Sequence, residues 1–255
     1  MQLNFKKLGE GKPFLIIHGL FGQLDNWNTM ARKIAGQQYS VYLIDLRNHG
    51  QSPHSDDFDY DVLAADLVEF IATHQLENVL LMGHSLGGKT AMNLALLHPG
   101  LIRKLIIVDI GVRYYAPHHS EILAALNSLN LEVLKTRAGV EKTLSESIGD
   151  YGTRQFLLKN LFWKTDAQLA WRFNLSAIEK HIDEVGKQTT SDEPFRKPTL
   201  FIRGANSNYI TDADAAEIHN LFPQAVVITA PDAGHWVHAD APVWMLEKVV
   251  EFIGA

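Results

Sequence analysis

The stretch VLLMGHSLGGKTAMNLALLH, residues 79–98, decides the fold. Its first part, Val79–Met82, is a continuous apolar run, which is typical of a strand covered on both faces. Its last part, Leu86–Leu97, has the apolar spacing of a helix. Between them stands the pattern G-x-S-x-G, with small residues on both sides of Ser85. A serine at such a strand-to-helix turn is typical of a nucleophile elbow, so the sequence predicts Ser85 as a nucleophile.

The alternation of strand and helix extends through most of the chain. Short apolar runs lie between segments with helical spacing, and this order predicts an α/β fold with a doubly wound, mainly parallel sheet. The predicted strands are Phe14–Ile17, Val41–Ile44, Val79–Met82, Leu105–Val108, Thr199–Ile202 and Val226–Thr229. The predicted helices between them are Thr29–Gly36, Tyr60–His74, Leu86–His98, Ala213–Leu221 and Pro242–Ile253.

The alternation stops between residues 112 and 196, where we find no convincing strand. We interpret residues 112–196 as a helical cap, or lid, inserted into an α/β core made of residues 1–111 and 197–255. Extra crossover helices without a lid role are the alternative interpretation. The helical runs expected in this segment are Glu121–Leu129, Glu132–Lys135, Val140–Ser147, Thr153–Trp163 and Leu175–Val185.

Composition excludes several classes of protein. The chain has 255 residues, of which 46% are hydrophobic, enough for one large domain and too many for a mostly disordered protein. The net charge of −6 and the lack of a basic block argue against a nucleic-acid partner. The absence of cysteine excludes disulfide scaffolds and thiolate chemistry. No secretory signal or membrane span is evident, so we expect a cytoplasmic protein without membrane association, as a monomer or small homo-oligomer.

A serine nucleophile needs a base within hydrogen-bond reach, and that base needs an orienting partner. In a fold with a nucleophile elbow the expected chain order is serine, acid, histidine. His235 follows the last predicted strand and precedes the final helix, which places it at the same sheet edge as Ser85. The sequence therefore predicts His235 as the base, with His238 as the nearest alternative.

Two aspartates compete for the role of the acid. Asp109 directly follows the predicted strand Leu105–Val108, one strand beyond Ser85. The loop after Thr199–Ile202 holds no carboxylate until Asp212, which we interpret as a helix N-cap. We therefore favour Asp109 and leave Asp212, or a site without a true acid, as alternatives.

The oxyanion of a tetrahedral intermediate needs two hydrogen-bond donors. One is the backbone N–H of Leu86, directly after the nucleophile. The other is expected from the loop His18-Gly19-Leu20-Phe21-Gly22, through the amide of Leu20 or Phe21. We interpret His18 as a residue that braces this loop.

The positions of aromatic residues and the spacing of motifs give expectations about the substrate pocket and about cofactor or metal binding. Aromatic side chains of the cap and of nearby loops are expected to bind the acyl part of a substrate: Trp27, Phe156, Trp163 and Trp236. The chain has no glycine-rich phosphate loop, and its histidine pairs lack the spacing of a zinc site. We therefore expect neither a cofactor nor a metal. The spacing gives no role for Lys89.

Six segments together resemble the YbfF-type esterase group of the α/β-hydrolases. They are HGLFG at 18–22, DLRNHGQSP at 45–53, GHSLGGK at 83–89, KLIIVDI at 104–110, WRFN at 171–174 and AGHWVHAD at 233–240. The resemblance implies an α/β-hydrolase fold and serine-hydrolase activity on carboxyl esters, with activity on acyl-CoA thioesters also attributed to the group. It further implies Ser85 as nucleophile, Asp109 as acid and His235 as base, with Phe21 and Leu86 supplying the oxyanion amides.

The expected reaction is a two-step transfer of an acyl group to water, on a small-molecule acyl ester or thioester. Three alternatives use the same scaffold: a carbon–carbon bond hydrolase, a haloperoxidase-like enzyme, and a ligand receptor with slow turnover.

Overall fold

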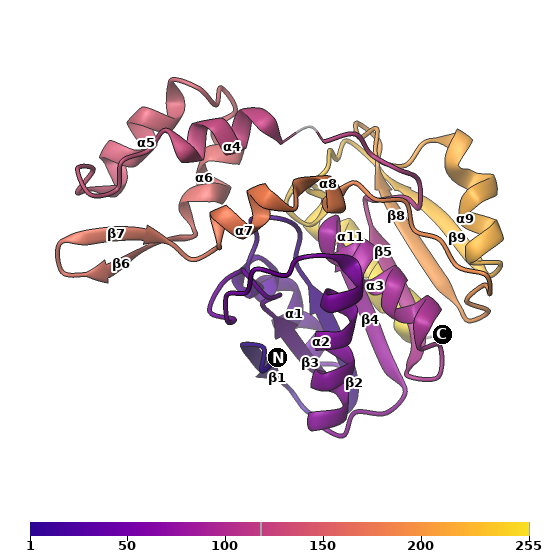
Figure 1. The fold of residues 1–255 in the computed structure, drawn as a ribbon. Helices are drawn as coiled ribbons and strands as arrows, with labels where there is room; N and C mark the ends of the chain where they lie inside the picture. Colours follow the sequence, from indigo (N-terminus) through magenta and orange to yellow (C-terminus); the bar gives the residue numbers. More distant parts are fainter. Residues whose placement is uncertain (118, 255) are drawn as a thin grey trace.

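The computed structural model describes residues 1–117 and 119–254 (Figure 1). Seven strands form one sheet in the order β1-β3-β2-β4-β5-β8-β9. β1 pairs antiparallel with β3, and the other six strands run parallel, which confirms the predicted sheet. The strands are β1 Phe5–Leu8, β2 Lys12–Ile17, β3 Tyr39–Ile44, β4 Val79–His84, β5 Ile102–Val108, β8 Thr199–Gly204 and β9 Ala225–Ala230.

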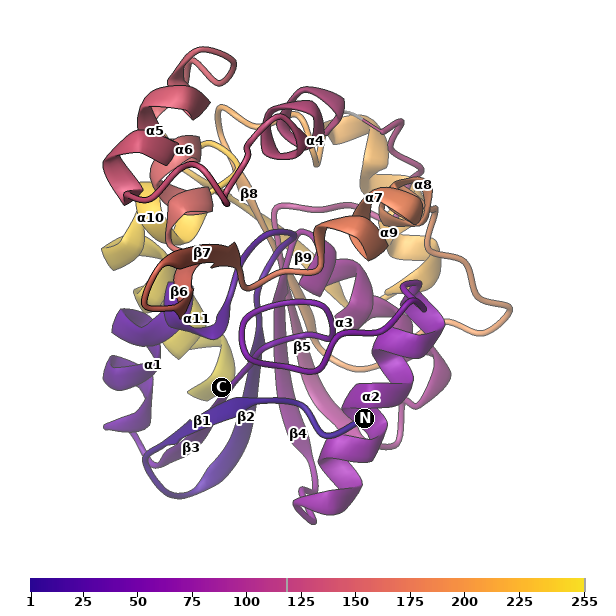
Figure 2. The same ribbon diagram turned by 60° about the vertical axis from the view of Figure 1, so that its left-hand side comes forward.

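Helices pack on both faces of the sheet (Figures 1 and 2). In β2, Phe14 and Ile16 belong to a cluster with α1 and α11, whereas Leu15 and Ile17 belong to a cluster with α2, α3 and α9. Burial on both faces explains why the strands read as continuous apolar runs. The helices of this core are η1 Leu24–Trp27, α1 Asn28–Ala35, α2 Tyr60–Thr73, α3 Leu86–Leu97, η2 Asp212–Asp214, α9 Ala215–Leu221, α10 Val237–Asp240 and α11 Pro242–Gly254.

Residues 112–196, which we call the cap segment, leave the core after β5 and return to it before β8. Figure 2 shows its helices over one end of the sheet. His118 of this segment lies outside the described residues. The elements of the cap segment are α4 Ser120–Asn127, α5 Arg137–Ser145, α6 Tyr151–Leu158, β6 Leu161–Thr165, β7 Gln168–Trp171, α7 Leu175–Lys180 and α8 Ile182–Val185.

The prediction that the cap segment lacks strands was wrong. β6 and β7 form an antiparallel hairpin, closed by a turn at residues 166–167. The helix expected over Thr153–Trp163 ends at Leu158, because Asn160 makes other contacts: its Nδ2 donates to the carbonyl of Phe21 at 2.7 Å. The run Glu132–Lys135, also expected to be helical, lies in a turn and an irregular stretch.

No helix within residues 1–117 and 119–254 is long and apolar enough to cross a membrane.

Candidate active site

Ser85 occupies the sharp turn between β4 and α3. Its backbone has φ 52° and ψ −117°, a conformation that side-chain-bearing residues rarely adopt. The strand and the helix approach each other so closely that a Cβ at Gly83 would lie 2.1 Å from the carbonyl oxygen of Gly87. A Cβ at Gly87 would lie 2.4 Å from the carbonyl oxygen of His18. The two glycines around Ser85 are therefore required by the packing of the turn.

Asp109 and His235, which are 126 residues apart in the chain, meet at the carboxyl end of the sheet. The His235 Nδ1 donates to Asp109 Oδ2 at 2.8 Å. Asp109 is fully buried, and it also accepts hydrogen bonds from the backbone N–H of Gly204 at 2.8 Å and from the hydroxyl of Ser207. Because a carboxylate can only accept, Nδ1 of His235 carries the proton, and Nε2 is left with the lone pair that a general base needs.

Three neighbours fix the position of His235. The Nε2–H of His84 donates to the carbonyl of His235 at 2.9 Å, and burial holds the pKa of His84 well below its usual value. The amide of Gly234 donates to Asp240 at 2.9 Å. The ring of Tyr209 stacks on the imidazole, with the centroids 4.0 Å apart. These contacts hold the backbone next to the imidazole in place and cover one face of its ring.

The alternative acid lies elsewhere. Asp212 is 94% exposed and pairs with Arg203 at 2.7 Å. Its predicted role as an N-cap was wrong, because Thr211 is the N-cap of η2 and forms a capping box with Asp214.

The alternative base also has other partners. His238 stacks on Trp27 with the centroids 4.4 Å apart, and burial lowers the pKa of His238 to about 4. Both rings line a cavity between η1, α6 and α10 that does not include Ser85.

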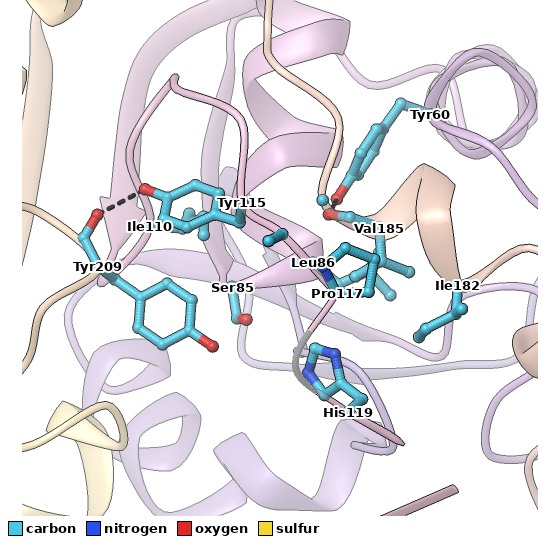
Figure 3. Close-up of a pocket in the computed structure, with 12 residues that line it drawn as sticks. Tyr60, Ser85, Leu86, Ile110, Tyr115, Pro117, His119, Ile182, Val185 and Tyr209 are labelled. Carbon is cyan, nitrogen blue, oxygen red and sulfur yellow. Dashed lines mark hydrogen bonds between the residues drawn. The ribbon is translucent and has the colours of Figure 1, made fainter. Parts of the chain in front are cut away.

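Ser85 stands between two hollows. We call the larger one the open cavity; it has a volume of about 420 Å³, and both Ser85 and His235 line it. We call the smaller one the side pocket; it has a volume of about 20 Å³ and continues from Ser85 toward α8. Figure 3 shows the side pocket, with Ser85 between Tyr209 on one side and Leu86 on the other.

The four aromatic residues expected at the substrate pocket are not all near Ser85. Phe156 and Trp236 line the open cavity, with ring centroids 5.4 Å apart. Trp27 is buried beneath His238 and faces the separate cavity. Trp163 lies on β6, is 53% exposed and lines neither hollow beside Ser85.

The amides expected to bind the oxyanion differ in their partners. The N–H of Phe21 donates to His49 Nε2 at 3.2 Å, and burial lowers the pKa of His49 to about 3, so that this nitrogen stays an acceptor. Leu20 and Phe21 both line the open cavity beside Ser85, so only the engaged amide of Phe21 distinguishes them. Leu86 begins α3, and the first N–H groups of a helix have no partner within it. Phe21 is therefore engaged elsewhere, whereas Leu20 and Leu86 are placed beside the nucleophile.

His18 braces the loop as expected. Its Nε2 accepts from the amide of Leu46 at 3.1 Å, and its Nδ1 donates to the carbonyl of Gly19 at 2.8 Å. Within the described part of the chain, no cluster of three histidine, aspartate or glutamate residues could hold a metal ion.

Comparison with known proteins identifies the family of this chain. Residues 12–134 match the family model described as alpha/beta hydrolase fold. The chain is 37% identical over 246 residues to the sn-1-specific diacylglycerol lipase ABHD11 of Mus musculus, and the match covers 94% of this chain and 80% of the relative. This chain belongs to the α/β-hydrolase family. It is a hydrolase of the YbfF-type esterase group, as its motifs predicted.

Other relatives of this α/β-hydrolase span nearly its whole length. Esterase YbfF of Escherichia coli is 34% identical over 243 residues, covering 94% of this chain and 92% of the relative. The solved structure titled "Marine microorganism esterase" is 44% identical, with a TM-score of 0.96 and coverage of 99% of both chains.

Proposed function

We propose that this α/β-hydrolase cleaves small acyl esters through Ser85, His235 and Asp109, by way of an acyl-enzyme. The observation that carries the proposal is the 2.8 Å hydrogen bond from His235 to the buried Asp109, on a loop that faces the same cavity as Ser85. This bond leaves Nε2 of His235 as the acceptor for the serine proton.

In the first step, Ser85 Oγ attacks the ester carbonyl while His235 Nε2 takes the hydroxyl proton. Ser85 and His235 share no direct hydrogen bond in the described structure, although both line the open cavity. Catalytic hydrogen bonds of this kind often tighten only when substrate is bound. Asp109 holds the imidazole in the required tautomer and stabilises its charged form.

The oxyanion formed in this step is bound, in our proposal, by the backbone amides of Leu86 and Leu20. Leu86 begins α3 directly after Ser85, and Leu20 lies in the loop after β2 that lines the open cavity together with Ser85. Each such donor stabilises a transition state by about 3–4 kcal/mol. Phe21 has an indirect role, because its bond to His49 fixes the loop that presents Leu20.

Collapse of the intermediate expels the alcohol, which takes the proton from His235. Water then enters, loses a proton to His235 and hydrolyses the acyl-enzyme through the same groups. A thiol can leave in the same way, so we extend the proposal to acyl thioesters.

The test is steady-state hydrolysis of p-nitrophenyl acetate, p-nitrophenyl butyrate and acetyl-CoA. We expect Ser85→Ala to lower kcat by at least about 10⁴-fold, because the nucleophile is removed. Ser145→Ala is the matched control, since Ser145 is exposed on α5. Unchanged turnover in Ser85→Ala would contradict the proposal, as would a wild-type protein that cleaves none of the three substrates.

A further inference from the structure

The open cavity and the side pocket differ in their catalytic groups. Ser85 borders both hollows, but His235 borders only the open cavity. Leu86, whose amide is one of the two proposed oxyanion donors, borders only the side pocket. Ser85 therefore borders one hollow that contains the proton donor His235 and a second hollow that does not.

The chemistry of ester cleavage assigns the two halves of a substrate to these sides. When the tetrahedral intermediate collapses, the C–O bond to the alcohol breaks and the departing oxygen takes the proton from His235. The leaving group must therefore lie in the open cavity. The acyl carbon stays bonded to Ser85, and its chain extends to the other side of the nucleophile.

We propose that the side pocket is the acyl-binding subsite and that its size selects short acyl chains, with a bulky alcohol or thiol in the open cavity. This inference rests on the proposed function and adds the substrate class to it.

The walls of the side pocket suit a small apolar group. Ile110 and Leu86 come from the core, and Ile182 and Val185 come from α8 of the cap segment. The volume of about 20 Å³ accommodates little more than one water molecule or one methyl group. The methyl group of an acetyl ester fits this space, whereas the heptyl chain of an octanoyl ester does not.

Hydrogen bonds engage two of the three phenol groups that line the side pocket, those of Tyr60 and Tyr115. The hydroxyl of Tyr60 donates to the carbonyl of Val185 at 2.7 Å, and this bond fixes the end of α8 against α2. The hydroxyl of Tyr115 accepts from the amide of Gly111 at 2.8 Å and donates to the carbonyl of Tyr209. Both phenols are therefore committed to holding the walls together, which keeps the pocket narrow.

The open cavity suits a larger group. It has about 420 Å³, and the paired rings of Phe156 and Trp236 form part of its wall. Aromatic walls of this kind bind large apolar groups. The predicted substrates are therefore short-chain esters of large alcohols, and not long-chain esters of small ones.

The experiment compares kcat/KM for p-nitrophenyl acetate and p-nitrophenyl octanoate. We expect the wild-type protein to prefer acetate by at least about tenfold, since a single methylene group in a fitted pocket already changes selectivity by about 10–200-fold. Ile182→Ala should raise the octanoate-to-acetate ratio by about tenfold, because it opens the pocket. Ile182→Phe should lower the butyrate-to-acetate ratio, because it fills the pocket.

Phe156→Ala is the matched control, as it enlarges the open cavity. It should leave the chain-length ratio unchanged and weaken the preference for p-nitrophenyl acetate over ethyl acetate. Each readout is a ratio of two substrates on one protein preparation, so partial unfolding of a variant does not alter it.

Two results would overturn the inference while leaving the hydrolase proposal intact. One is a wild-type preference for octanoate. The other is a chain-length ratio that responds to Phe156→Ala and not to the Ile182 variants, which would place the acyl chain in the open cavity. Hydrolysis that persists in Ser85→Ala would instead overturn the proposed function, and this inference with it.

Discussion

Asp109 combines complete burial with a left-handed backbone, at φ 49°. Three donors converge on its carboxylate: His235, Ser207 and the amide of Gly204. A carboxylate satisfies three donors, whereas an asparagine amide accepts only through its oxygen. Replacing one carboxylate oxygen of Asp109 by an amide NH₂ group would therefore leave one or more of these donors without an acceptor.

We expect Asp109→Asn to lower kcat on p-nitrophenyl acetate by about 10⁴-fold, because the imidazole then adopts the wrong tautomer. Asp212→Asn is the matched control and should change kcat less than about twofold, since Asp212 is 94% exposed. Steady-state kinetics of both variants gives the answer. A large loss in Asp212→Asn together with a small loss in Asp109→Asn would move the acid to the later loop.

Among the single residues of the site, those that directly follow a strand could be located from the sequence. Ser85 and Asp109 each end a recognisable apolar run, so their place at the sheet edge could be inferred. Ser207 and Tyr209 could not be assigned in the same way, because the loop after β8 was searched for a carboxylate and it instead supplies a hydroxyl and a ring. The bond from Phe21 to His49 was also missed, since it depends on how two loops pack against each other.

At the scale of elements, α3 is linked to both ends of the cap segment through Lys89. This side chain is 1% exposed, and its Nζ donates to the carbonyl of Arg113 at 2.9 Å and to the carbonyl of Lys187. Arg113 lies where the chain leaves the core, and Lys187 where it returns. Burial, with a smaller contribution from Arg113, lowers the pKa of Lys89 to about 7. Lys89, whose role could not be inferred from its spacing in the sequence, therefore joins the two connections of the cap segment.

We expect Lys89→Met to lower the free energy of unfolding by about 1–3 kcal/mol, because it removes the donor from the partly buried carbonyls of Arg113 and Lys187. Urea denaturation measures this loss, and limited proteolysis should show faster cleavage near residues 113 and 187. Lys164→Met on the exposed part of β6 is the control and should match the wild type. Equal stability and equal cleavage in all three proteins would rule out the linking role of Lys89.

The elements that were predicted and those that were missed differ in burial. The five central strands carry buried apolar side chains on both faces, and all five were predicted. The edge strand β9 was also predicted from its apolar run, although it is partly exposed. β1 reads FKKL, alternates between exposed and half-buried, and lies at the sheet edge, so it lacks that signal. β6 and β7 are short and form a two-stranded sheet of their own. Phe162 and Trp163 of β6 were assigned to the end of a helix, and β7 was assigned to no element. The limits and the lid role of the cap segment stay predictions.

At the scale of the whole molecule, buried histidines make the fold sensitive to acid. Burial lowers the pKa of His18 to about 4, of His49 to about 3 and of His238 to about 4, and it holds that of His84 well below its usual value. In an unfolded chain each of the four would titrate near 6.5. Between about pH 6.5 and 4 the unfolded chain therefore binds up to four more protons than the folded one.

Stability should fall as the pH falls through this window, since the unfolded state binds more protons there. Each histidine contributes up to about 1.4 kcal/mol per pH unit to the slope. Urea denaturation at pH 8, 6.5, 5.5 and 4.5 measures the free energy of unfolding and its slope with pH. Above pH 7 we expect these histidines to leave the free energy of unfolding nearly constant, and below pH 6 we expect it to decline steeply. A free energy of unfolding that stays constant down to pH 4.5 would show that the buried histidines do not govern acid stability.

Sequence reasoning at this scale reached the fold class and the esterase group, because both depend on motifs spread over the whole chain. Cytoplasmic location and oligomeric state depend on surfaces and cellular context, so they stay predictions.

The most direct test of the central claim is to map the site of covalent labelling by a fluorophosphonate with peptide mass spectrometry. If Ser85 is the hydroxyl activated by His235 and Asp109, the wild-type protein carries one adduct, on the peptide that contains Ser85. Labelling should then be abolished in Ser85→Ala and strongly slowed in His235→Gln. An adduct on a different serine, or labelling of Ser85 at the same rate in His235→Gln, would contradict the account.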